Sequence, residues 1–121
     1  MSSVALAGRR VLVVEDNFLL AIDLAGMLER AGAEVVGPVM SVEEALAALD
    51  PLPDVATLDV QLGEETSFPI ADELARHGIP FVFVTGAGGM IPTAHQSRPL
   101  CHKPFSDRAV LGALIDALHP N

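Results

Sequence analysis

Residues 54–59 read Asp-Val-Ala-Thr-Leu-Asp, and the predicted fold is organised around this stretch. It is an apolar run of strand length that ends in a carboxylate, and a polar turn follows around Leu62 and Gly63. In an open parallel sheet, chemistry gathers in the crevice beyond the carboxyl ends of the strands. We therefore expect Asp59 to lie at such a crevice.

Three other apolar runs also end in polar residues. They end in Glu15-Asp16, in Thr85-Gly86 and in Lys103-Pro104. Because the carboxyl ends of parallel strands meet at one edge of a sheet, these residues would bring acids, a hydroxyl and an ammonium to the rim that holds Asp59. The sequence predicts one site built from four strand ends.

The composition fits one packed domain. The chain has 121 residues, of which 50% are hydrophobic and 19% are charged, which suffices for one core and is too short for two ordinary domains. We expect a complete single-domain protein, with the domain at residues 9–119 and an N-terminal extension at residues 1–8. The formal net charge of −9 argues against direct binding of nucleic acid or an anionic membrane, because both need a basic surface.

The expected location is the cytoplasm. Cys101 is the only cysteine, so no internal disulfide can form, and this is compatible with a reducing compartment. The N-terminus lacks the layout of a signal peptide, since its short apolar piece precedes Arg9-Arg10. Residues 78–97 carry no Asp, Glu, Lys or Arg, but repeated prolines and glycines exclude a membrane-spanning helix there.

Strands and helices are predicted to alternate along the chain. Strands are expected at residues 10–14, 34–39, 54–59, 81–84 and 99–102, and helices at residues 17–31, 45–49, 67–77 and 106–118. The segment 86–96 allows at most a short helix, because its glycines and Pro92 oppose a longer one. The expected helix caps are Asp16 or Asn17 for the first helix, a capping box of Ser41 with Glu44, Thr66 or Ser67, and Ser106.

This alternation favours an α/β fold with a five-stranded parallel sheet, right-handed crossovers and helices on both faces. The first run, residues 10–14, shows no polar alternation, which is typical of a central strand covered on both sides. Pro38 lacks a donor for the sheet, so residues 34–39 are expected at an edge.

The acidic residues of the predicted rim suggest a metal site. Glu15, Asp16 and Asp59 would lie close together, and like charges at short range raise each other's pKa unless a positive group intervenes. Mg²⁺ fits, because it binds carboxylate oxygens and keeps room for waters and phosphate oxygens. The simpler alternatives are that the acidic pair only caps a helix and that Lys103, the only lysine, is a buried counterion for Asp59.

An aspartate carboxylate can attack phosphorus and form an acyl phosphate if the incoming negative charge is neutralised. Mg²⁺ and Lys103 would neutralise it. The hydroxyl of Thr85 can hydrogen-bond a phosphoryl oxygen, and Gly86 leaves the backbone free to approach the group.

The ordered set of Glu15-Asp16, Asp59, Thr85 and Lys103-Pro104 resembles the response regulator receiver domain, the phosphoacceptor of two-component signalling, from Arg9 to Leu118. The resemblance implies a flavodoxin-like sheet of strand order 2-1-3-4-5 and phosphorylation on Asp59. It implies direct Mg²⁺ ligation by Asp16, Asp59 and the backbone carbonyl of Gln61, with Glu15 acting largely through water. It also implies a cis peptide at Lys103-Pro104, and roles for Lys103 and Thr85 in the transfer.

Two positions depart from the family pattern. Leu100 stands where many receivers have an aromatic residue, so a rotating-ring switch cannot operate there. Residues 83–86, Phe-Val-Thr-Gly, are similar to a receiver subset that reads Phe-Ala-Thr-Gly, but Gly88 occupies the place of that subset's tyrosine. We therefore expect that phosphate draws Thr85 inward and reorders the loop of residues 86–89.

The resemblance implies a sensor histidine kinase or phosphotransfer protein as the donor, and an unidentified downstream protein as the receiver of the signal. The chain would catalyse only its own phosphorylation and dephosphorylation, and homodimerisation stays open. The alternatives include a constitutive docking module in which phosphorylation is incidental. An aspartyl phosphatase is disfavoured because Gln61 stands where its second acid would be, and a flavin binder because Glu15-Asp16 would repel phosphate.

Overall fold

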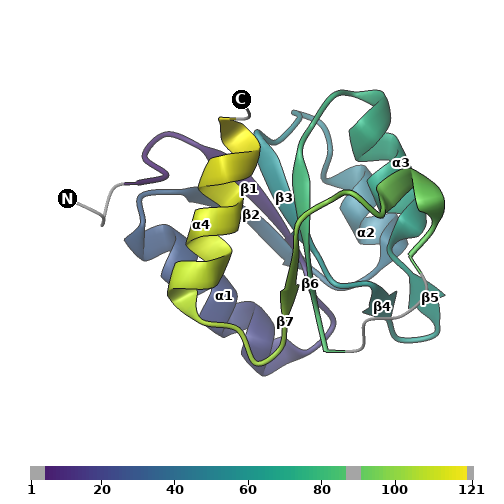
Figure 1. Cartoon of the computed structure of the whole chain (residues 1–121), viewed down its shortest axis with the longest axis horizontal. Coiled ribbons are helices and arrows are strands. Elements are labelled where there is room, and N and C mark those ends of the chain that lie inside the picture. Colours follow the sequence, from purple (N-terminus) through teal and green to yellow (C-terminus); the bar gives the residue numbers. More distant parts are fainter. Residues whose placement is uncertain (1–4, 87–90, 120–121) are drawn as a thin grey trace.

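Five parallel strands form one sheet in the computed structural model, which describes residues 5–86 and 91–119 (Figure 1). The spatial order is β2 (Glu34–Val39), β1 (Arg10–Val14), β3 (Val55–Leu58), β6 (Phe81–Thr85) and β7 (Leu100–His102). Counted along the chain, this is the predicted order 2-1-3-4-5, and all four pairings are parallel. The α/β fold, the interior position of β1 and the edge position of β2 are thus confirmed.

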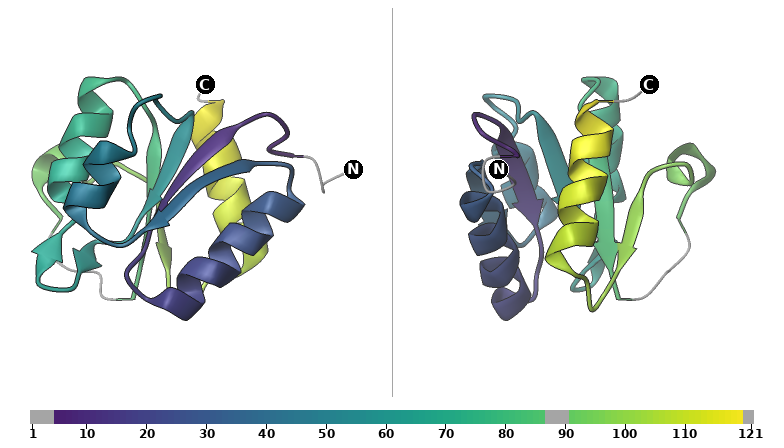
Figure 2. Two further views of the ribbon diagram at one scale, coloured as in Figure 1. Left: turned by 180° about the vertical axis from the view of Figure 1, so that it is seen from behind. Right: turned by 60° about the vertical axis from the view of Figure 1, so that its left-hand side comes forward.

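Four α-helices cover the two faces of the sheet (Figure 2). α1 (Phe18–Arg30) and α4 (Asp107–Leu118) pack on one face, and α2 (Val42–Ala47) and α3 (Phe68–Arg76) pack on the other. Each face of the sheet carries one apolar cluster, and alternate residues of the strands contribute to one cluster or the other. In β1, for example, Val11 and Val13 face α1 and α4, while Leu12 and Val14 face α2 and α3. The sheet is therefore buried on both sides, which explains its continuous apolar runs.

Polar caps begin three of the helices as predicted. Asn17 accepts a hydrogen bond from the Leu20 N–H through its side chain, and Ser106 accepts one from the Ala109 N–H in the same way. The Ser41 hydroxyl accepts from the Glu44 N–H at 3.1 Å. The Glu44 carboxylate accepts from the Met40 N–H at 2.8 Å, so it reaches back to the residue before the cap rather than to the Ser41 N–H of a standard capping box.

Two predicted details were wrong in position or in chemistry. The second helix spans Val42–Ala47 rather than residues 45–49, because it begins directly after its cap Ser41. Ser67 precedes α3 as expected, but its hydroxyl is buried and makes no capping bond to the described residues.

The turn after Asp59 is a small antiparallel hairpin of β4 (Gln61–Leu62) and β5 (Glu65–Thr66). Its strands are too short to be recognised from hydrophobic periodicity.

The connection between β6 and β7 differs from the other connections of the sheet. In its described part, residues 91–99, the only helical element is a 3₁₀ turn, η2 (Thr93–His95), which confirms the prediction of at most a short helix. Gly88 and most of the predicted switch loop, residues 87–89, lie outside the described residues.

The N-terminal segment contributes to the core. Leu6 has no exposed surface, packs in the cluster of α1 and α4, and donates its N–H to the Ala31 carbonyl at 2.8 Å. Gly32 ends α1 with a φ of +95°, and a Cβ at this position would lie 3.0 Å from Ala7 Cα. Among the described residues, no helix has the length and apolar character needed to cross a membrane.

Candidate functional site

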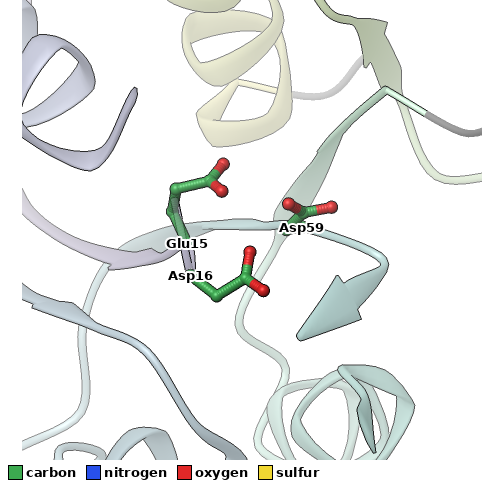
Figure 3. A group of neighbouring side chains, drawn as sticks. All are labelled: Glu15, Asp16 and Asp59. Carbon is green, nitrogen blue, oxygen red and sulfur yellow. The ribbon is translucent and has the colours of Figure 1, made fainter. Parts of the chain in front are cut away.

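Three carboxylates gather where two neighbouring strands end (Figure 3). Glu15 and Asp16 follow β1, and Asp59 follows β3. The strand hydrogen bonds continue up to these residues, since the Asp59 N–H donates to the Val14 carbonyl at 3.0 Å. One carboxylate oxygen from each of the three residues lies within 4.8 Å of the other two. The sheet therefore brings the predicted acidic residues together.

Lys103 links the two buried carboxylates of this cluster. Its Nζ lies 2.7 Å from Asp59 Oδ2 and 2.8 Å from Glu15 Oε1. The side chains of Glu15 and Asp59 are 2% and 8% exposed, and among the described residues only this ammonium compensates their charge. The peptide bond between Lys103 and Pro104 is cis, as the resemblance implied.

The pKa values of Glu15 and Lys103 are both raised, but for different reasons. Burial raises the pKa of Glu15, because the ionised carboxylate loses hydration, while hydrogen bonds from Lys103 and from the Asn17 N–H partly offset this. Burial alone would lower the pKa of Lys103, but its bonds to Asp59 and Glu15 outweigh burial and raise it. Lys103 is therefore held in its charged form.

The hairpin after Asp59 borders the exposed side of the cluster. Asp16 is exposed, and its Oδ2 accepts a hydrogen bond from the Gly63 N–H at 2.8 Å. The Gln61 N–H lies 3.4 Å from Asp59 Oδ1, so the backbone of Gln61 adjoins this carboxylate. The Gln61 side chain donates to the carbonyls of Gly63 and Glu65, both at 2.9 Å, and this fixes the turn.

Sequence reasoning did not find two of these backbone donors. The N–H groups of Asn17 and Gly63 hold Glu15 and Asp16 in place. For Gly63 a signal existed, since a glycine in a short polar turn after a strand often takes a positive φ, and its φ is +63°. For Asn17 no signal separated this role from its role as helix cap.

Thr85 lies at the end of the neighbouring strand β6. It is 1% exposed, and its carbonyl accepts a hydrogen bond from the Lys103 N–H at 2.9 Å. Since β6 lies between β3 and β7, Thr85 stands between the strand that ends at Asp59 and the strand that leads to Lys103. All four predicted strand ends thus meet at one edge of the sheet.

The cluster suits a hard divalent cation. Three carboxylates face one ammonium, so the negative charges are in excess, and a divalent ion would neutralise them. The donor atoms are oxygens, and Asp16 opens the site to solvent, which fits the preference of Mg²⁺ for a few carboxylates and several retained waters.

Comparisons with known proteins agree with this geometry. No family model matches the chain. The chain is 34% identical over 113 residues to the transcriptional regulatory protein PdtaR of Mycobacterium tuberculosis, a match that covers 88% of this chain and 55% of PdtaR. The chain spans about half the length of the curated relatives it matches.

Solved structures extend the likeness to nearly the whole chain. SdrG from Sphingomonas melonis Fr1 is 40% identical with a TM-score of 0.81, and the match covers 94% of this chain and 98% of SdrG. The response regulator PhyR from Brucella abortus is 29% identical with a TM-score of 0.80, and the match covers 96% of this chain and 50% of PhyR. With its sheet order and its acidic cluster at the strand ends, this chain belongs to the receiver domain family of response regulators.

Proposed function

We propose that the chain is a phosphoacceptor switch of a two-component phosphorelay, phosphorylated on Asp59 with Mg²⁺ and signalling by protein contact. The observation that carries the proposal is the position of Lys103 Nζ, which lies 2.7 Å from Asp59 Oδ2 inside a cluster of three carboxylates. If Lys103 were only a counterion, that would explain its contacts with the buried carboxylates of Asp59 and Glu15. It would not explain why the exposed carboxylate of Asp16 belongs to the same cluster.

In the proposed reaction, an Asp59 carboxylate oxygen attacks the phosphorus of a phosphohistidine on a donor protein. The new O–P bond forms as the P–N bond breaks, and the electron pair of that bond stays on the donor imidazole. The Lys103 ammonium then pairs with a phosphoryl oxygen, and the Thr85 hydroxyl donates a hydrogen bond to another. Asp59 keeps its orientation through its backbone bond to Val14.

Mg²⁺ would be held by Asp16, Asp59 and the backbone carbonyl of Gln61, with Glu15 acting through water. When bound, it supplies positive charge that lowers the repulsion between the carboxylates and the incoming phosphoryl group. The Asn17 N–H donates to Glu15 Oε2 at 3.0 Å, which helps to orient this carboxylate.

A docking surface for the donor, a sensor histidine kinase or a phosphotransfer protein, adjoins the site. Three large apolar side chains at the start of α1 are exposed although α1 begins directly beside Asp16: Phe18 is 63% exposed, Leu19 is 72% exposed and Ile22 is 49% exposed. A cavity of about 510 Å³ lies between α1 and the start of α4 and is lined by Leu20, Arg30 and Phe105, among others. An apolar patch beside the phosphorylation site suits a transient protein complex.

The test is incubation with acetyl phosphate and Mg²⁺, followed by measurement of the intact mass. The wild-type chain is expected to gain one phosphoryl group, and Asp59→Asn is expected to gain none. Asp54→Asn, which alters an acid outside the cluster, serves as the matched control and is expected to gain the group. Uptake by wild type and Asp59→Asn alike, or by neither, would contradict the proposal.

One observation favours a second candidate, a constitutive docking module. Leu100 replaces the aromatic residue of many receivers, and it packs half-buried against the cluster of α2 and α3. If the chain docks its downstream partner equally well with and without phosphate on Asp59, this second function holds instead.

A further inference from the structure

The segment Ile91–Arg98 is attached to the rest of the domain by a buried histidine. His95 is 3% exposed, and its Nε2 lies 2.7 Å from Asp72 Oδ1 on α3. Figure 1 shows this stretch of chain, coloured green, running beside α3. The Asp72 side chain is 73% exposed, so the bond joins a covered ring to a residue at the surface.

Phe81 of β6 provides a second attachment, and Ile91 packs partly buried against the cluster of α2 and α3. The His95 ring meets the Phe81 ring edge-on, with centroids 5.6 Å apart and an interplanar angle of 67°. The guanidinium carbon of Arg98 lies 4.4 Å from the centroid of the same ring. One phenylalanine is thus held by two residues of the segment through aromatic and cation–π contacts.

The backbone of the segment adds no further attachment in the described part of the chain. The His95 N–H bonds to the Pro92 carbonyl, the Gln96 N–H to Thr93 and the Arg98 N–H to His95, all within the segment. The side-chain amide of Gln96 also turns back to the Ile91 carbonyl at 3.0 Å. The position of the segment therefore depends on the side chains of Ile91, His95 and Arg98, of which His95 is the buried one.

The second nitrogen of His95 is unsatisfied in this position. Nδ1 is buried and has no hydrogen-bond partner among the described residues. A buried polar atom without a partner disfavours the arrangement that buries it, and solvent would satisfy this atom if the segment moved away. The bond to Asp72 thus favours the closed position, whereas the unpaired Nδ1 of His95 disfavours it, and opening the segment would let water satisfy that nitrogen.

The segment also joins the two strands that carry Thr85 and Lys103. Phe81, Phe83 and Thr85 alternate onto one face of β6, so the residue that the segment holds and the residue at the site share a face. After the segment, β7 leads directly to Lys103. A movement of residues 91–98 can therefore affect the site through β6 and Thr85 on one side and through β7 and Lys103 on the other.

We propose that His95 and Asp72 form a latch that holds residues 91–98 over Phe81, and that opening of this latch is coupled to phosphoryl transfer at the site. The coupling rests on the proposed function of Asp59, whereas the latch itself does not. If the open position is the one that reacts with the phosphodonor, protein in which the latch is already open reacts faster, because a larger fraction of it is competent.

The latch is tested first on the unphosphorylated chain, by amide hydrogen exchange followed by NMR at Gln96 and Arg98. Asp72→Ala removes the acceptor at an exposed position and leaves the core untouched. We expect it to speed exchange at both amides about tenfold, the effect of losing one hydrogen bond to a charged group. Glu73→Ala is the matched control, because Glu73 lies beside Asp72 on α3 but contacts Arg76 and His77 at the end of the helix. Equal exchange at Gln96 and Arg98 in wild type and Asp72→Ala would overturn the latch.

The coupling is tested by the rate of phosphoryl uptake from acetyl phosphate with Mg²⁺. We expect Asp72→Ala to react several-fold faster than wild type and Glu73→Ala to react at the wild-type rate. Equal rates in all three proteins, with fast exchange in Asp72→Ala, would overturn the coupling and leave the latch standing. No uptake by any of them would contradict the proposed function of Asp59 and the coupling with it, while the exchange result still decides the latch.

Discussion

Lys103 Nζ lies 2.7 Å from Asp59 Oδ2, although 44 positions separate the two residues in the chain. The same nitrogen lies 2.8 Å from Glu15 Oε1, so one ammonium compensates two buried carboxylates. This relationship would make the stability of the domain and the proposed chemistry of the site depend on the same side chain.

Lys103→Gln is expected to lower the free energy of unfolding by about 3 kcal/mol in the absence of Mg²⁺, because Glu15 and Asp59 then face each other without a cation. Part of this loss should return on addition of Mg²⁺, which can replace the missing positive charge. Urea denaturation with EDTA and with Mg²⁺ measures both effects. Arg108→Gln, at an exposed cation of α4, is the control and should show neither. An equal loss with and without Mg²⁺ would speak against a metal site here.

Asp16→Asn is expected to weaken Mg²⁺ binding by on the order of tenfold or more while the fold is kept. Asp16 is exposed, and an asparagine can still accept the bond from the Gly63 N–H. Titration followed by NMR is the suitable measurement, since the chain has no Trp or Tyr for fluorescence. Asp23→Asn on α1 removes a nearby exposed acid and should leave the affinity unchanged. Equal affinities of Asp16→Asn and wild type would exclude Asp16 as a ligand.

The pKa of Glu15 predicts a specific pH dependence of stability without metal. Burial raises this pKa above its ordinary value of 4.5, so the folded state holds the proton more tightly than the unfolded state. The resulting stability is complete below 4.5 and is lost as the pH rises through the raised pKa. Glu15→Gln lacks this loss, and the unfolding free energy of the variant minus that of wild type should increase over this window. Urea denaturation of both proteins in EDTA measures the difference, and a difference that stays constant with pH would contradict the assignment.

Thr57→Val is expected to stabilise the domain by about 1 kcal/mol. Thr57 lies in β3, is 1% exposed, and its hydroxyl oxygen is buried without a hydrogen-bond partner among the described residues. Valine has nearly the same shape and no polar atom to leave unsatisfied. Thermal unfolding compares the variant with wild type and with Thr93→Val, an exposed control. A lower melting temperature in Thr57→Val would show that the hydroxyl has a partner in solution.

Local signals were sufficient to predict the strands and the residues at their ends, whereas the order of the strands in the sheet was implied by the resemblance to receiver domains. Apolar runs ending in Glu15-Asp16, Asp59 and Thr85 place these residues at strand ends, and the parallel sheet then brings them together. The caps Asn17, Ser41 and Ser106 are local as well, since each bonds an N–H three residues ahead.

What the sequence did not reveal depends on contacts between distant segments. The bond of His95 to Asp72 spans 23 positions, and neither residue stands in a pattern that points to the other. The burial of Leu6 against α1 and α4 requires the packed helices to be in place. The hairpin of β4 and β5 has two residues in each strand, which is too few for a period of two to be recognised.

The most direct test of the central claim locates the phosphoryl group itself. After incubation with acetyl phosphate and Mg²⁺, borohydride reduction converts an aspartyl phosphate to homoserine, and tandem mass spectrometry of the peptides then identifies the modified position. We predict homoserine at position 59 in wild type and its absence when Mg²⁺ is replaced by EDTA. Homoserine at another aspartate, or none at position 59 in a folded protein loaded with Mg²⁺, would contradict the proposed role of Asp59.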